Sequence, residues 1–254
     1  MNTFISCFFW GSSHLDGIVF GGQAESIEAL LNEKYGGGFY LGGGNGNVKS
    51  MGHLYVNSSG VLEGSGLFLS GNTTSGYGGA LSNAGTVSID GATFSGNAAR
   101  YYGGAVYSTS RATIRNAVFA TETDTIYSRG SLTLGGKIRT AANITSSNIA
   151  VTVEENTQLV LDLSVYEGTT SKELLSGFQT MFGNSQGNLT LSVNVAANQE
   201  DGDYILATDV GTLSQQSFTV TLDDDASKSF HISVGDTTLY SSKDYTLSLD
   251  GGTL

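Results

Sequence analysis

Short stretches in which hydrophobic and polar residues alternate recur along the middle of the chain. Apolar residues stand two positions apart at Val87 and Ile89, and again at Leu132 and Leu134. This period of two indicates β-strands with one buried face. Between residues 40 and 165 there is no long amphipathic run of the kind that a helical repeat needs. The pattern therefore predicts an all-β protein built from many short strands.

The alternating stretches return at a fixed interval and define a 25-residue repeat. Three segments carry it, and they begin at positions 59, 84 and 109: SGVLEGSGLFLSGN (59–72), AGTVSIDGATFSGN (84–97) and TSRATIRNAVFATE (109–122). One coil per repeat, with short strands and glycine-rich corners, is typical of a β-solenoid. Since parallel crossover connections are overwhelmingly right-handed, we predict a right-handed parallel β-helix over residues 36–165.

The repeat also predicts which side chains stack, because equivalent positions of successive rungs lie about 4.8 Å apart. Leu69, Phe94 and Phe119 occupy one such position and are expected to form an internal apolar stack. Asn72 and Asn97 occupy another and are expected to form a ladder of hydrogen-bonded amides.

A glycine pair recurs with the same period, in GGAL (78–81) and GGAV (103–106). Glycine adopts positive φ angles without a steric penalty, so each pair is expected to form a corner of the coil. The alanine that follows each pair is small enough to point inward beside that corner.

These motifs carry a resemblance to a known family. GGAL (78–81) and GGAV (103–106), interleaved with FSGN (94–97), are similar to the GGA[I/L/V] and FxxN repeats of the chlamydial polymorphic outer-membrane proteins and related autotransporter passengers. Two copies depart from the pattern: LSGN (69–72) and FATE (119–122). The resemblance, over roughly residues 50–130, implies a β-helical passenger that is secreted or displayed at the cell surface or outer membrane, and an adhesin-like role.

The flanking segments lack the repeat. Ile27, Leu30 and Leu31 have helical spacing, so residues 1–35 are predicted to be an N-terminal cap with a helix that covers the open end of the coil. Residues 171–183 are a second helical candidate. Alternating segments separated by polar turns follow, and they predict an antiparallel β-rich module over 166–254.

Composition and charge agree with an all-β fold and narrow the classes of partner and of cellular location. The 36 glycines, the absence of proline and the 13% of charged residues fit short strands and turns. A net charge of −12 argues against nucleic acid as a partner. The chain has no apolar segment long enough for a transmembrane helix. The N-terminus lacks the basic residues of a signal peptide, and both ends resemble cuts in a longer protein.

The sequence offers few residues for catalysis. Acidic residues in the repeat region are few and not close in register: Glu63, Asp90, Glu122 and Asp124. We therefore expect no catalytic residue, no cofactor and no metal. A β-helical polysaccharide lyase or glycoside hydrolase is the alternative, and a trimeric tailspike-like fibre shares the same fold.

One group of residues stands out as a binding candidate. Arg100, Tyr101 and Tyr102 precede the second glycine pair, where a loop is expected to protrude. Exposed aromatic and arginine side chains suit contact with a glycan or a host-cell ligand. The simpler interpretation is that the two tyrosines only cover a corner. In a lyase, Arg100 would be the nearest candidate for neutralising a substrate charge.

Overall fold

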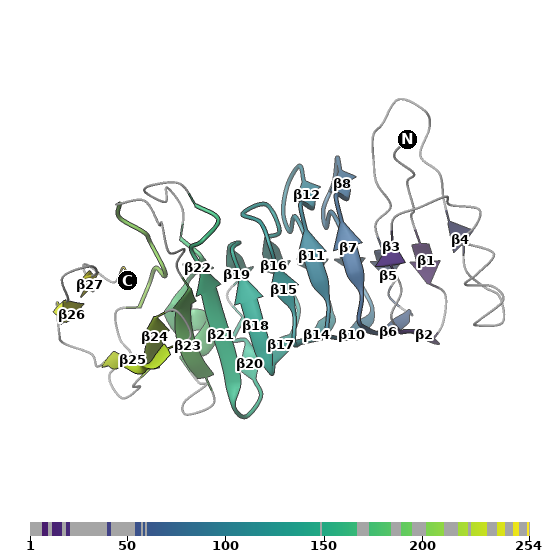
Figure 1. Cartoon of the computed structure of the whole chain (residues 1–254). Helices are drawn as coiled ribbons and strands as arrows, with labels where there is room; N and C mark the ends of the chain where they lie inside the picture. The colour runs from purple at the N-terminus through teal and green to yellow at the C-terminus, as the bar shows by residue number, and fades with distance from the viewer. Residues whose placement is uncertain are drawn as a thin grey trace.

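A computed structural model shows a chain that coils through three stacked sheets (Figure 1). Backbone and side chains are described for residues 54–56, 58, 60–147, 149–166, 173–183, 189–194, 202–210 and 253. The strands that lie outside these ranges are described by their backbone alone.

Each sheet is a column of strands from successive coils. Sheet A runs through β22 (Leu175–Ser176), β19 (Ile144–Ser146), β16 (Ile126–Ser128), β13 (Val106–Ser108), β9 (Leu81–Asn83), β5 (Leu54–Val56), β1 (Cys7–Phe9) and β4 (Tyr40–Leu41). Sheet B runs through β2 (Ser12–Asp16), β6 (Val61–Ser65), β10 (Thr86–Asp90), β14 (Arg111–Arg115), β17 (Leu132–Gly135) and β20 (Thr152–Val153). Sheet C runs through β25 (Asp225–Ile232), β24 (Phe218–Leu222), β23 (Leu189–Asn194), β21 (Thr157–Asp162), β18 (Lys137–Thr140), β15 (Val118–Phe119), β11 (Thr93–Ser95), β7 (Phe68–Ser70) and β3 (Val19–Phe20).

The chain visits the three sheets in turn, and strands of successive coils pair in parallel, which confirms the predicted parallel β-helix. Two short strands, β8 (Thr73–Thr74) and β12 (Ala98–Ala99), form a further parallel ladder that protrudes at the top of Figure 1. The right hand of the coil stays a prediction from the general preference of parallel crossovers.

The register follows the repeat seen in the sequence. Thr86 on β10 pairs with Val61 on β6 and with Arg111 on β14, which are its equivalents in the preceding and the following repeat. The next coil is shorter, since Ala112 on β14 pairs with Leu132 on β17 and not with Lys137, where a full repeat would end. The coil therefore keeps its register in the sheets and changes length in the connections between them.

The N-terminal part differs from the predicted cap. Strands β1, β2 and β3 pair in parallel with β5, β6 and β7, so these three strands form a rung of the β-helix. A long insertion between this rung and the next hides the period, because Cys7 pairs with Leu54, far beyond the position that a single repeat would reach. The helix predicted around Ile27, Leu30 and Leu31 lies outside the described residues.

The C-terminal part also continues the coil further than predicted. Strand β23 pairs in parallel with both β21 and β24, beyond the expected boundary near residue 166. Antiparallel pairing is present, but it begins with β24 and β25 and recurs between β26 (Thr238–Ser241) and β27 (Thr246–Ser248). Of the helix predicted over 171–183, only the single turn α2 (Phe178–Phe182) is helical, and Leu175 and Ser176 belong to strand β22 instead.

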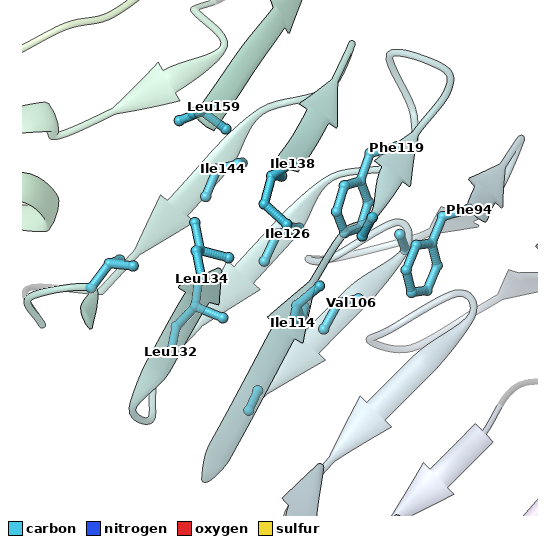
Figure 2. Packing of buried hydrophobic residues seen from close by; sticks show 14 of the residues in the cluster. Phe94, Val106, Ile114, Phe119, Ile126, Leu132, Leu134, Ile138, Ile144 and Leu159 are labelled. Atoms are coloured by element: carbon cyan, nitrogen blue, oxygen red, sulfur yellow. The ribbon is translucent and has the colours of Figure 1, made fainter. Parts of the chain in front are cut away.

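The interior of the coil is a column of apolar side chains (Figure 2). Leu69, Phe94 and Phe119 stack as predicted, because register pairs them and all three are buried. The rings of Phe94 and Phe119 lie almost parallel, with centroids 4.7 Å apart and planes 3° apart. Each rung thus buries its apolar face against the rungs on either side.

The two glycines of each corner have different roles. Gly78 and Gly103 have φ angles of 66° and 68°, as the corner prediction required. At Gly104, by contrast, a Cβ atom would lie 1.7 Å from the carbonyl oxygen of Thr123 in the next rung. The second glycine is therefore needed for close approach of two backbones.

The predicted amide ladder is confirmed and ends on a carboxylate. Asn72 Nδ2 donates to Asn97 Oδ1 at 2.8 Å, and Asn97 Nδ2 donates to Asp124 Oδ1 at 2.8 Å. Asp124 replaces the asparagine that the third repeat lacks, and its side chain also accepts from the backbone N–H groups of Asn97, Gly96 and Thr121. Asn97 and Asp124 are fully buried.

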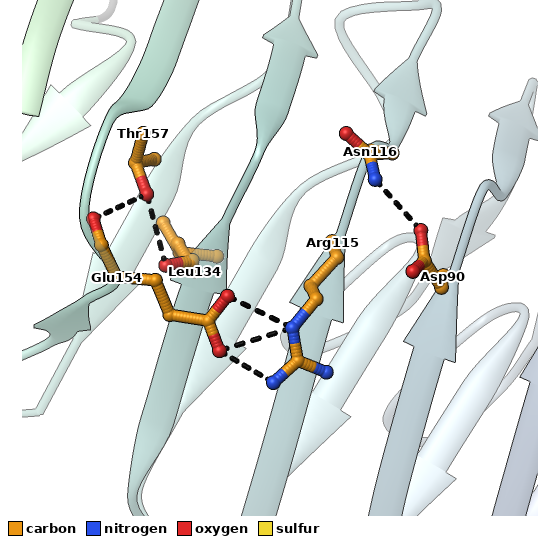
Figure 3. A network of polar contacts seen from close by, with 6 residues as sticks. All are labelled: Asp90, Arg115, Asn116, Leu134, Glu154 and Thr157. Carbon is orange, nitrogen blue, oxygen red and sulfur yellow. Dashed lines mark hydrogen bonds and ion pairs between the residues drawn. The ribbon is translucent and has the colours of Figure 1, made fainter.

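Polar side chains on the outer faces connect one rung to another. Arg115 Nε donates to Glu154 Oε2 at 2.8 Å, two rungs away (Figure 3). Gly135 lies between them, where a Cβ atom would be 2.1 Å from Glu154 Oε2. Asn116 Nδ2 donates to Asp90 Oδ1 at 2.8 Å on the same sheet. Gly135 thus leaves the space through which the ion pair forms.

A second ion pair, on sheet C, predicts how stability responds to acid. Burial raises the pKa of Asp162, but hydrogen bonds from Arg139, Ser164 and Asn194 outweigh this and hold it below its ordinary value. A lowered pKa in the folded state contributes stability that is present above about pH 4 and lost as the pH falls further. Asp162→Asn should therefore lose less stability than the unaltered protein between pH 7 and pH 3, measured by urea unfolding at both pH values. Equal losses in the two proteins would contradict this assignment.

Candidate functional site: a tyrosine cluster on sheet A

Five tyrosines gather on the outer side of sheet A. Tyr77 lies in the connection from β8 to β9, and Tyr101 and Tyr102 lie in the equivalent connection from β12 to β13. Tyr107 and Tyr127 belong to β13 and β16 and pair with each other in the sheet register. We call these five residues the tyrosine cluster. Tyr77 and Tyr102 occupy the same position of the repeat, directly before the glycine corner.

Tyr77 and Tyr102 each lie against a strand tyrosine of the following rung. The ring centroids of Tyr77 and Tyr107 are 4.7 Å apart, with planes inclined by 30°. Those of Tyr102 and Tyr127 are 4.4 Å apart, with planes inclined by 25°. The repeat therefore generates the same aromatic contact twice, one rung apart along the coil.

Further contacts join the two pairs into one surface. Tyr77 and Tyr102 have centroids 6.1 Å apart, and Tyr107 and Tyr127 have centroids 6.0 Å apart. The ring centroid of Tyr101 lies 5.2 Å from that of Tyr77. Aromatic pairs at such separations favour one another beyond simple burial, so the cluster is held by its own contacts as well as by the coil.

The cluster has a buried base and an exposed crest. Tyr107 keeps 9% of its surface exposed, whereas Tyr77, Tyr101 and Tyr102 keep 43%, 55% and 52%. These three are among the most exposed large hydrophobic residues of the described chain. A role limited to covering the corner would leave less aromatic surface in water.

Two arginines border the tyrosines. The Arg100 guanidinium carbon lies 5.6 Å from the ring centroid of Tyr101. A hydrogen bond with Tyr107 is the main cause that raises the pKa of Arg129, and the hydroxyls of Tyr127 and Tyr77 act in the same direction. Both arginine side chains are exposed. In the described part of the chain neither has a carboxylate partner, whereas Arg115 has Glu154.

The sequence located only part of this site. The structure places Arg100, Tyr101 and Tyr102 in the connection between β12 and β13, where all three are exposed. Sequence reasoning missed Tyr77, Tyr107, Tyr127 and Arg129. Tyr77 could have been found, because it stands one full repeat before Tyr102. The strand tyrosines gave a weaker signal: IYS (126–128) is similar to VYS (106–108), but outside the strict 25-residue period, and Ser82 holds the position of Tyr107 one rung earlier.

The acidic residues of the repeat region lie elsewhere and have structural partners. Asp124 is buried at the end of the amide ladder, and Asp90 accepts a hydrogen bond from Asn116. Over the described ranges, no group of three or more histidine, cysteine or acidic side chains could hold a metal ion. None of the helices in those ranges is long and apolar enough to cross a membrane.

Comparison of the chain with protein-family models, with curated proteins and with solved structures found no match.

Proposed function

We propose that this chain is a non-catalytic bacterial β-helical module, secreted or displayed at the cell surface, that binds a glycan through the tyrosine cluster in the manner of an adhesin. The observation that carries the proposal is the exposed crest of Tyr77, Tyr101 and Tyr102. Tyrosine combines a large apolar ring with a hydroxyl group, so it contacts both the C–H surface and the hydroxyls of a sugar. Tyrosine and arginine are also the residue types that dominate binding energy at protein surfaces.

The extracellular setting and the adhesin-like role rest on the alternating GGA[I/L/V] and FxxN motifs. The stacked coil is the scaffold expected for such a passenger, and loops carried on a rigid scaffold are common binding sites. Fractionation of cells that produce the protein from its natural gene tests the location. Recovery only from the cytosol would contradict surface display.

The glycan-binding role predicts a loss of affinity when the crest is removed. The double variant Tyr101→Ala/Tyr102→Ala should bind at least about tenfold more weakly than the unaltered protein, which corresponds to about 1.4 kcal/mol. The measurement is binding to an array of neutral and charged glycans, followed by calorimetry on those that bind. Phe68→Ala is the matched control, because Phe68 is an aromatic residue of sheet C with 41% of its surface exposed. Equal losses in both variants, or no binding to any glycan, would refute the proposal.

The alternative is a β-helical polysaccharide lyase or glycoside hydrolase acting at the same place. One observation favours it: a tyrosine, able to act as a general base, stands beside a free guanidinium at Tyr101 and Arg100. Incubation of the protein with a polysaccharide panel distinguishes the two functions. New reducing ends or unsaturated products that disappear in Tyr101→Phe would establish the enzyme and exclude a purely adhesive role.

A further inference from the structure

We propose that the glycan bound by the tyrosine cluster is an acidic polysaccharide, whose carboxylate groups pair with Arg100 and Arg129 while its sugar rings contact the tyrosines. This inference rests on the proposed function and adds the chemical class of the ligand. Three observations carry it: the charge balance of the chain, the partners of its arginines, and the direction in which the cluster extends.

The first observation is the rarity of positive charge. The chain carries 11 lysines and arginines against 23 acidic residues. A surface with this balance repels an anionic polymer over most of its area, because like charges at the surface raise the energy of approach. An anionic polymer is therefore directed to places where basic side chains gather without acidic neighbours. Charge arrangement of this kind acts mainly on specificity and association rate.

The second observation is that four of the five arginines of the described chain fall into two groups, while the fifth, Arg111, begins β14 on sheet B, away from the tyrosine cluster. Arg115 and Arg139 are engaged in ion pairs with Glu154 and Asp162, which join one rung of the coil to another. Arg100 and Arg129 instead lie beside tyrosines: the Arg100 guanidinium faces the ring of Tyr101, and the backbone N–H of Arg129, just after β16, donates to Ser108 O at 2.7 Å, next to Tyr107. The guanidinium fork matches a carboxylate with two parallel hydrogen bonds. These two arginines keep that capacity for a ligand.

The third observation is the direction of the cluster. Tyr77, Tyr102 and Tyr127 come from three successive rungs, so the aromatic surface extends about 10 Å along the axis of the coil. Arg100 and Arg129 border it on successive rungs as well. A linear polymer with an acid group on its repeating units, lying along the axis, contacts several tyrosines and both arginines at once. A single small anion would use only one end of this surface.

The experiment compares charged polymers with uncharged forms of the same chain. Polygalacturonate, alginate and hyaluronan are titrated into the full protein by calorimetry, each beside its methyl-esterified form. We expect at least one acidic polymer to bind, its ester to bind at least tenfold more weakly, and the affinity to fall as salt rises. Failure of all three acidic polymers, or equal affinity for the esters, would overturn the inference.

Variants place the charge recognition on the two arginines. Arg100→Gln/Arg129→Gln should weaken binding of the acidic polymer at least tenfold and remove most of its preference over the ester. Lys137→Gln is the matched control, since it removes one positive charge from sheet C and should change binding less than twofold. Because all three side chains are exposed, circular dichroism should show unchanged folding. An equal effect of Lys137→Gln and the arginine variant would refute the assignment.

The outcomes also separate this inference from the proposed function. Tyrosine-dependent binding of neutral glycans, with the arginine variant unchanged, would leave the adhesive function standing and refute the acidic ligand. No binding of any glycan, neutral or charged, would refute both.

Discussion

Replacing Phe94 by alanine is expected to lower the free energy of unfolding by about 3–5 kcal/mol, the usual loss when a buried phenylalanine is truncated. Phe94 is fully buried and stands in the middle of the stack, in register with Leu69 before it and Phe119 after it. Truncation therefore opens a cavity against both neighbouring rungs. Since rungs of a solenoid contact only their neighbours, the loss falls on two interfaces at once.

Chemical denaturation followed by circular dichroism measures this loss, and hydrogen exchange of the β7, β11 and β15 amides locates it. Phe94→Leu is the graded comparison, because it copies Leu69 of the preceding rung, and it should cost less than about 1.5 kcal/mol. Phe68→Ala on the same sheet, where the ring is 41% exposed, should cost less than the core variant. A loss in Phe94→Ala no greater than in Phe68→Ala would contradict the internal stack.

The coils with the 25-residue repeat could be predicted from the sequence, because coils of the same shape need similar residues at equivalent positions. Val87 and Ile89 point inward from β10, and Ala112 and Ile114 occupy the matching positions of β14. Equivalent residues of successive coils pair directly in the parallel sheets, because a shift by one residue would turn the apolar side chains outward. Apolar positions therefore repeat with the period of the coil. Where three successive coils have the same length, the sequence displays this period directly.

Coils that change length conceal the same fold. Leu191 on β23 pairs in parallel with Leu159 on β21 and with Val220 on β24, and both intervals are longer than the strict repeat and differ from each other. The strands still stack, but the long connections contribute no repeat. Alternation alone does not distinguish parallel from antiparallel pairing, because both place every second side chain on one face. For this reason the sequence prediction of an antiparallel module over 166–254 places the end of the coil too early.

The candidate site likewise has one part that the local sequence reveals and another that only the stacking of rungs creates. Arg100, Tyr101 and Tyr102 are visible in the sequence because they are adjacent and polar or aromatic beside a glycine corner. Tyr107 and Arg129 are not, because a strand residue and a corner residue become neighbours only when one rung is stacked on the next. Contacts between rungs depend on connection length, which local patterns do not specify.

Asp124 provides the second large expected effect. Asp124→Ala should lower the free energy of unfolding by about 2–4 kcal/mol, because each buried donor left without an acceptor costs about 1–3 kcal/mol. The donors concerned are the side-chain amide and backbone N–H of Asn97, both at 2.8 Å from the carboxylate. Thr121 also donates to it, from its backbone N–H at 3.0 Å and its hydroxyl at 2.7 Å.

Two further variants separate the acceptor role of Asp124 from its charge. Asp124→Asn keeps one carbonyl oxygen that accepts from Asn97. Its NH₂ group takes the place of Oδ2 and therefore faces the N–H of Gly96, which is also a donor. The loss in free energy of unfolding should therefore be smaller than in Asp124→Ala but greater than zero. Glu122→Gln removes a negative charge two residues away at an exposed position and should change stability by less than about 0.5 kcal/mol. Urea unfolding at pH 7 gives the ranking. If Asp124→Asn were as stable as the unaltered protein, a single acceptor would suffice and the carboxylate would not be required to end the ladder. If Glu122→Gln matched Asp124→Ala, net charge rather than hydrogen bonding would explain the loss.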